Sequence, residues 1–140
     1  PDTMFIGSGA LWGETILFSM CILEEMQWKR TRYITSADFF HGTLELVEPG
    51  VPVFLFMGED ENRKLDERAR AFLTRGVTGD TDINIIDTAE FAIPGLDDEF
   101  RVIVSPWILT VLVTDRLARY YETVTKHNLK YRRYYHQFDY

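Results

Sequence analysis

The stretch that decides the fold is Val51-Pro52-Val53-Phe54-Leu55-Phe56-Met57-Gly58. Residues 51–57 are all apolar, and the run ends at a glycine without any alternation of polar and apolar side chains. Strands of this composition are typical of parallel sheets, because helices cover both faces of the inner strands. The stretch therefore predicts an inner strand of an α/β protein.

Strand-like and helix-like segments alternate on both sides of this run. The expected strands are short apolar segments next to turn residues, at residues 3–6, 32–34, 51–57 and 82–87. The expected helices have apolar positions three or four residues apart, at residues 10–28, 36–40, 59–75 and 106–125. Gly7-Ser8-Gly9 forms the turn into the first helix, Ser36 is the expected N-cap of the second, and Gly76 is the expected stop of the third.

The segment before the last helix is the least regular part. Residues 88–101 contain Pro94-Gly95 and predict an irregular connection. Residues 102–105 predict a last strand or an extended entry, and Pro106 is expected near the first turn of the final helix. Strands that alternate with helices imply a parallel sheet between two helical layers, with right-handed crossovers. The predicted fold is a three-layer αβα domain over residues 1–125, followed by a basic and aromatic tail over residues 126–140.

Composition narrows the class of protein. The 140 residues, 46% of them apolar, suit one domain with one good core. A net charge of −7 argues against nucleic-acid binding, and the apolar run 16–23 is far too short to span a membrane. The single cysteine, Cys21, predicts a small core residue, which excludes a disulfide framework and fits a reducing cytoplasm. The chain starts at Pro1 with a strand close behind it, and this predicts a piece of a longer protein.

Two glutamates end the first predicted helix. Glu24 and Glu25 both continue its apolar positions at helical spacing, so periodicity alone does not choose between them. They fit two ordinary carboxylates at a solvated helix end. Acids at the negative end of a helix dipole are nevertheless mildly unfavourable, which indicates another role, and a half-buried carboxylate can take and return a proton.

The other candidate groups are an imidazole, a turn and a set of bases. His41 precedes Gly42, a neighbour that permits an exposed turn and close approach of a ligand, although a lone histidine is more often a surface or core residue. The N–H groups of the Gly7-Ser8-Gly9 turn could meet an anion or a sugar, but the third glycine of a dinucleotide site is missing. Lys130, Arg132 and Arg133 could bind phosphate or carboxylate, or belong to a solvated tail. The sequence shows no metal, P-loop or Ser-His-Asp pattern.

These residues resemble the second half of the sugar isomerase (SIS) domain family. The likeness is carried by Glu25, by His41-Gly42 sixteen residues later, by Glu45 within Thr43-Leu44-Glu45-Leu46-Val47, and by the buried strand from Pro52. Within the family, the segments LEEMQW, ADFFHGTLELVE and RRYY resemble bacterial deglycases of phosphorylated Amadori compounds. The resemblance implies a flavodoxin-like parallel sheet, and it assigns proton transfer to Glu25 rather than Glu24, with His41 assisting.

Two departures qualify the resemblance. Glucosamine-6-phosphate synthase has a lysine three residues before its glutamate, whereas this chain has Ile22, which argues against that enzyme. The phosphate-gripping Ser/Thr loop of such proteins lies in their first SIS half. The chain is therefore expected to be half of an active site, inactive alone, and completed by a missing N-terminal half in a homodimer.

The resemblance implies hydrolysis of a 6-phosphofructosyl amino acid, such as 6-phosphofructose-aspartate, to glucose 6-phosphate and the amino acid. It implies no cofactor or metal. The candidates for substrate contact come from the residues themselves: Gly7, Ser8, Gly9 and Gly42 through their backbone, and Lys130, Arg132 and Arg133 through their charge alone. Two alternatives stay open: an aldose–ketose phosphosugar isomerase, and a non-catalytic SIS module that senses a phosphosugar.

Overall fold

The computed structural model describes residues 2–76 and 78–140 and contains a four-stranded parallel sheet. The strand order is β2-β1-β3-β4, and each neighbouring pair is parallel. The strands are β1 (Thr3–Gly7), β2 (Thr31–Ile34), β3 (Val53–Met57) and β4 (Ile83–Asp87). All four strands are those expected, and the all-apolar run forms β3 between two neighbours.

The helical segments include several 3₁₀ and π turns. They are η1 (Gly9–Leu11), α1 (Trp12–Ile16), η2 (Leu17–Met26), α2 (Ser36–Phe39), η3 (Thr43–Leu46), α3 (Arg63–Leu73), η4 (Thr88–Glu90), η5 (Asp98–Phe100), α4 (Arg101–Leu109), η6 (Thr110–Leu117) and α5 (Ala118–Thr125). Among the described residues, none of these helices is long and apolar enough to cross a membrane.

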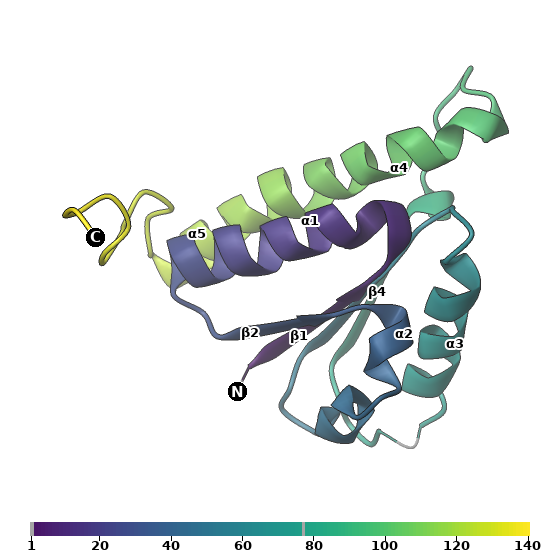
Figure 1. Ribbon diagram of the computed structural model, residues 1–140, viewed down its shortest axis with the longest axis horizontal. Helices are drawn as coiled ribbons and strands as arrows, with labels where there is room; N and C mark the ends of the chain where they lie inside the picture. Colours follow the sequence, from purple (N-terminus) through teal and green to yellow (C-terminus); the bar gives the residue numbers. More distant parts are fainter. Residues whose placement is uncertain (1, 77) are drawn as a thin grey trace.

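Each face of the sheet has its own helical layer, as Figure 1 shows. Successive residues of a strand point to opposite faces. Phe5 and Phe56 accordingly pack on one face with residues of η2, α4 and η6, such as Phe18 and Leu109. The neighbouring strand residues pack on the other face with α2 and α3. The α/β, three-layer prediction is therefore confirmed.

Helix α3 is shorter than predicted. A helix was expected over residues 59–75, but α3 runs only from Arg63 to Leu73. Asp60 explains the difference, because its Oδ1 accepts a hydrogen bond from the Asn62 N–H at 2.7 Å and holds a turn there. The second helix was expected to have Ser36 as its N-cap. The cap is instead Thr35, whose hydroxyl accepts from the Asp38 N–H at 3.0 Å.

The prediction for residues 102–105 was wrong. They form no strand but the first turns of α4, which begins at Arg101. Pro106 therefore lies inside the helix and not near its first turn. A proline there cannot donate to the carbonyl four residues earlier, which is that of Val102. The Ser105 hydroxyl donates to this carbonyl instead, at 3.1 Å.

Candidate active site

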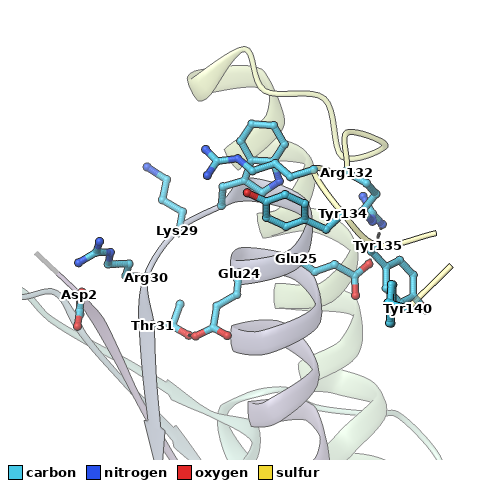
Figure 2. Close-up of a pocket in the computed structure, with 12 residues that line it drawn as sticks. Asp2, Glu24, Glu25, Lys29, Arg30, Thr31, Arg132, Tyr134, Tyr135 and Tyr140 are labelled. Carbon is cyan, nitrogen blue, oxygen red and sulfur yellow. Dashed lines mark hydrogen bonds and ion pairs between the residues drawn. The ribbon is translucent and has the colours of Figure 1, made fainter. Parts of the chain in front are cut away.

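Glu24 and Glu25 lie on η2, a π-helical stretch, and their side chains point in different directions (Figure 2). Glu24 points toward β2, where its Oε1 accepts a 2.6 Å hydrogen bond from the Thr31 hydroxyl. Glu25 points toward the C-terminal tail, where its Oε1 forms a 2.9 Å ion pair with Arg132 Nη2. π-Helical turns are frequent at functional sites because they shift the side chains that follow. The geometry thus separates the two carboxylates that periodicity could not.

A pocket of about 690 Å³ opens beside these two carboxylates. Its lining combines carboxylates, bases and aromatic rings from η2, the loop into β2 and the tail: Asp2, Glu24, Glu25, Trp28, Lys29, Arg30, Thr31, Arg132, Arg133, Tyr134, Tyr135 and Tyr140. A volume of this size is in the range of pockets for small molecules. The pocket lies at the amino end of the strands, because Asp2 directly precedes β1 and Lys29 and Arg30 directly precede β2.

The tail is anchored to the end of η2 through Trp28. This residue has a left-handed backbone (φ 54°), a conformation unusual for a bulky side chain. The Arg133 guanidinium lies 4.0 Å over the indole, and the His127 ring meets it edge-on with centroids 4.3 Å apart. Gln27 adds a 2.7 Å hydrogen bond from its amide nitrogen to the His127 carbonyl. These contacts hold the segment that brings Arg132 to Glu25.

The three predicted tail bases lie in two different hollows. Arg132 and Arg133 both line the pocket, whereas Lys130 lies against a separate surface hollow beside Glu122 and Asn128. Arg132 also donates from Nη1 to the Leu129 carbonyl at 2.7 Å. Its buried Nε has no hydrogen-bond partner within the described part of the chain. A buried donor without a partner is uncommon in folded proteins.

His41 and Gly42 lie away from this pocket. They follow α2, which packs on the opposite face of the sheet from η2, so the sheet separates them from Glu25 (Figure 1). Both are exposed, and the φ of +136° at Gly42 favours glycine at that position. One copy of the chain therefore does not bring the imidazole and Glu25 together.

The Gly7-Ser8-Gly9 turn is occupied by the chain's own side chains. The Ala10 N–H, the first after the turn, donates to Asp60 Oδ2. A Cβ on Gly9 would collide with this carboxylate. The Ser8 hydroxyl accepts from the Ser36 N–H at 2.8 Å. The anion contact predicted for this turn stays a prediction, and it would have to displace Asp60.

Buried acids hold the loops at the carboxyl end of the strands. Asp66 accepts from the Ser36 hydroxyl and, at 3.2 Å, from the Gly58 N–H, and its burial raises the pKa of this carboxyl. Hydrogen bonding from Arg63, with Nη2 2.7 Å from Oδ2, lowers the pKa of Asp87. Near the pocket, burial raises the pKa of the Cys21 thiol, and the charge of Glu25 adds to the effect.

Sequence reasoning missed most of the pocket wall. Lys29, Arg30 and Thr31 line it because the loop after η2 turns back at Trp28 toward β2. Trp28 and the tail tyrosines were visible as an aromatic excess, but their meeting place depends on how the tail folds over η2. The pocket offers carboxylates, Glu25 among them, near a cluster of bases, which is suited to proton transfer on an anionic substrate.

Comparisons with known proteins identify relatives. No protein-family model matches the chain. It is 32% identical over 132 residues to fructosamine deglycase FrlB of Bacillus subtilis, covering 92% of this chain and 38% of the relative. It is 35% identical over 116 residues to fructoselysine 6-phosphate deglycase of Escherichia coli, covering 81% of this chain and 31% of the relative.

A crystal structure from Bacillus subtilis, named as that of a candidate phosphosugar isomerase, superposes with a TM-score of 0.88 at 29% identity. The match covers 99% of this chain and 41% of that one. The chain is a homologue of the deglycases. Its fold is the sugar isomerase fold of these neighbours, and it spans well under half the length of each of these relatives.

Proposed function

We propose that the chain is the C-terminal half of a phosphosugar deglycase, which hydrolyses a 6-phosphofructosyl amino acid to glucose 6-phosphate and the free amino acid. The observation that carries the proposal is the pocket at Glu25, in a chain homologous to deglycases. The pocket places a carboxylate among bases and aromatic rings, where an anionic sugar derivative has partners for its charge.

Glu25 would act as the base and then as the acid. In the open-chain ketosamine it removes a proton from C1, and the electrons of that C–H bond form a C1=C2 double bond. The π pair of the C2 carbonyl moves to its oxygen, which takes up a proton, and the product is an enaminol. Return of a proton to C2 shifts the double bond to C1 and nitrogen, giving an imine. Water adds to this imine and the C–N bond breaks, releasing the aldehyde sugar and the amine. The exchange needs only proton transfers and water.

His41 would act in a neighbouring subunit. The sheet separates it from Glu25 of the same chain, and the imidazole is exposed. In a symmetric dimer each subunit can supply His41 to the partner's pocket, for ring opening or as the acid at the leaving nitrogen. The phosphate would be held by the missing N-terminal half, since Asp60 already occupies the N–H group after Gly9.

Arg132 and Arg133 would meet the amino-acid portion of the substrate. Both line the pocket, and a guanidinium binds carboxylate in a bidentate manner. Binding would release Arg132 from Glu25 and so free the carboxylate for proton transfer. Lys130 was expected to share this role, but it lines a different hollow, so its contact with the substrate has less structural support.

The test is product analysis with the whole polypeptide and a panel of phosphorylated Amadori compounds. Glu25→Gln and His41→Ala should each slow amino-acid release by about 10²- to 10⁴-fold while circular dichroism and Tm stay unchanged, because each removes one acid–base group. Glu24→Gln is the matched comparison, since its carboxylate is engaged by Thr31. Near-normal release in the Glu25→Gln protein would remove Glu25 from the mechanism.

A second candidate is an aldose–ketose phosphosugar isomerase. The structural neighbour named as a candidate phosphosugar isomerase favours it, and the same C1-to-C2 proton shuttle is required. Incubation of the whole polypeptide with fructose 6-phosphate separates the two functions. Formation of glucose 6-phosphate at a rate above that of amino-acid release would favour the isomerase.

A further inference from the structure

The helical run from α4 to α5 has two apolar sides. Leu109 and Val113 are buried against the sheet. On the outside, exposed apolar side chains include Phe100 (47%), which immediately precedes α4, and Ile103 (67%), Trp107 (69%) and Val111 (48%) along the run. Trp107 and Leu109 are two positions apart, which is about 200° around a helix at 3.6 residues per turn. The two apolar sides are therefore nearly opposite.

These four exposed residues, the outer stripe, follow one another at intervals of three, four and four positions. That spacing places them on one line along the helix. Isolated exposed apolar residues are ordinary, but a continuous apolar line marks a contact surface. A helix that is apolar on both sides is typically covered on both sides. In Figure 1 the start of α4 projects beyond the sheet, where it is free to meet another body.

The length of the relatives indicates what covers the stripe. The chain matches 38% of FrlB and 41% of the solved Bacillus subtilis structure. About three fifths of that solved chain, on the order of 200 residues, lies outside the matched region. A domain of this size has a radius of gyration of about 16 Å. The helical run of residues 101–125 is about 37 Å long at 1.5 Å per residue. One such domain can therefore lie along the whole run.

We infer that the outer stripe is the surface on which the remaining part of the polypeptide packs. The inference rests on the proposed function for one point, that this remaining part also holds the phosphate. The helical layer that carries the stripe also carries Glu25, on η2, and the end of η2 lies beside α5, because Gln27 Oε1 accepts from the Thr125 hydroxyl at 2.8 Å. A domain along this layer would reach the open pocket that Glu25 and Arg132 line.

The experiment measures thiol labelling in the whole polypeptide. Ile103→Cys places a thiol on the stripe, and Glu67→Cys is the matched control on α3, in the opposite layer, at a side chain that is 50% exposed. Labelling with a maleimide is followed by mass spectrometry of the peptide that contains each new cysteine. The thiol of the Ile103→Cys variant should react at least about tenfold more slowly than the thiol of the Glu67→Cys variant, because its reaction requires the interface to open.

Equal labelling rates at the two positions would overturn the inference. Protection that disappears on dilution, in step with dissociation of a dimer, would also overturn it, because the stripe would then be covered by a second copy. Val111→Cys repeats the measurement on the stripe if the Ile103 variant does not fold. The readout needs no turnover, so the Glu25→Gln test and this one can fail independently.

Discussion

Asp66 joins three loops at the carboxyl end of the strands. Its two oxygens accept from the Ser36 hydroxyl and the Gly58 N–H, and the Ser36 N–H in turn donates to Ser8. The side chain is 1% exposed. Burial favours the neutral acid more than these hydrogen bonds favour the carboxylate, so the pKa is raised in the folded state.

A raised pKa has a definite consequence for stability. Below the unfolded pKa of about 3.9, Asp66 is protonated in both states. As pH rises through the folded pKa, the folded protein must give up a favoured proton, so the stabilising contribution of Asp66 is lost. The loss is about 1.4 kcal/mol for each pH unit that separates the folded and unfolded pKa values.

Asp66→Asn should remove this dependence, because an amide keeps one acceptor for Gly58 and can donate to Ser36. We expect the free energy of unfolding of the variant minus that of wild type to increase as pH rises from about 4, because the wild type loses stability, and then to level off above the folded pKa. Urea unfolding from pH 4 to 8 measures it. A difference that does not change with pH, or that changes in the opposite direction, would show that the raised pKa is wrong.

Ser105 compensates for the proline inside helix α4. Pro106 leaves the Val102 carbonyl without its usual donor, and Ser105 supplies one. Ser105→Ala should therefore cost about 1 kcal/mol of unfolding free energy, read from urea unfolding. In a Pro106→Ala background the cost should nearly vanish, since the new N–H donates to Val102.

Thr110→Val is the matched control for the Ser105 variant. The Thr110 hydroxyl donates to the Pro106 carbonyl, which also accepts from the Thr110 N–H, so loss of the hydroxyl should have a smaller effect. An equal cost for Ser105→Ala with and without Pro106 would show that the serine acts in some other way.

The elements that the sequence predicts well are those whose apolar residues pack against both helical layers. The apolar run of β3 and the strand at residues 83–87 are correct because both layers cover them. Val102, Ile103 and Val104 misled the prediction because β-branched residues favour strands, whereas packing of α4 against η1 keeps this segment helical. The pairing of Glu25 with Arg132 could not be predicted, because it joins residues 107 positions apart through a tail without regular structure.

The position of the pocket concerns the whole molecule. Ligands of open parallel sheets usually bind beyond the carboxyl ends of the strands. The Glu25 pocket lies at the amino ends, and the carboxyl-end loops are held by Asp60 and Asp66. In the dimer proposed above, a partner subunit would complete a site at this end, and His41 is the first residue to test.

Mixing two inactive variants tests this dependence. If His41 serves the partner's pocket, a dimer with one Glu25→Gln and one His41→Ala subunit contains one intact site. Equal mixing after dissociation should restore about a quarter of wild-type amino-acid release, because half the dimers are mixed and each has one working site of two. Each variant refolded alone is the control. No recovery, with mixed dimers demonstrated by mass spectrometry, would place His41 outside the shared site.

The carboxylate of Asp60 beside Ala10 has a bearing on inhibitor design. A tethered group competes with any dissolved anion at an effective concentration of millimolar order or higher. Phosphate isosteres aimed at the Ala10 N–H would thus compete with the Asp60 carboxylate that already accepts from it. Chemists seeking selective compounds should build outward from Glu25 toward the indole that Arg133 covers, where a flat aromatic fragment could take the guanidinium's place.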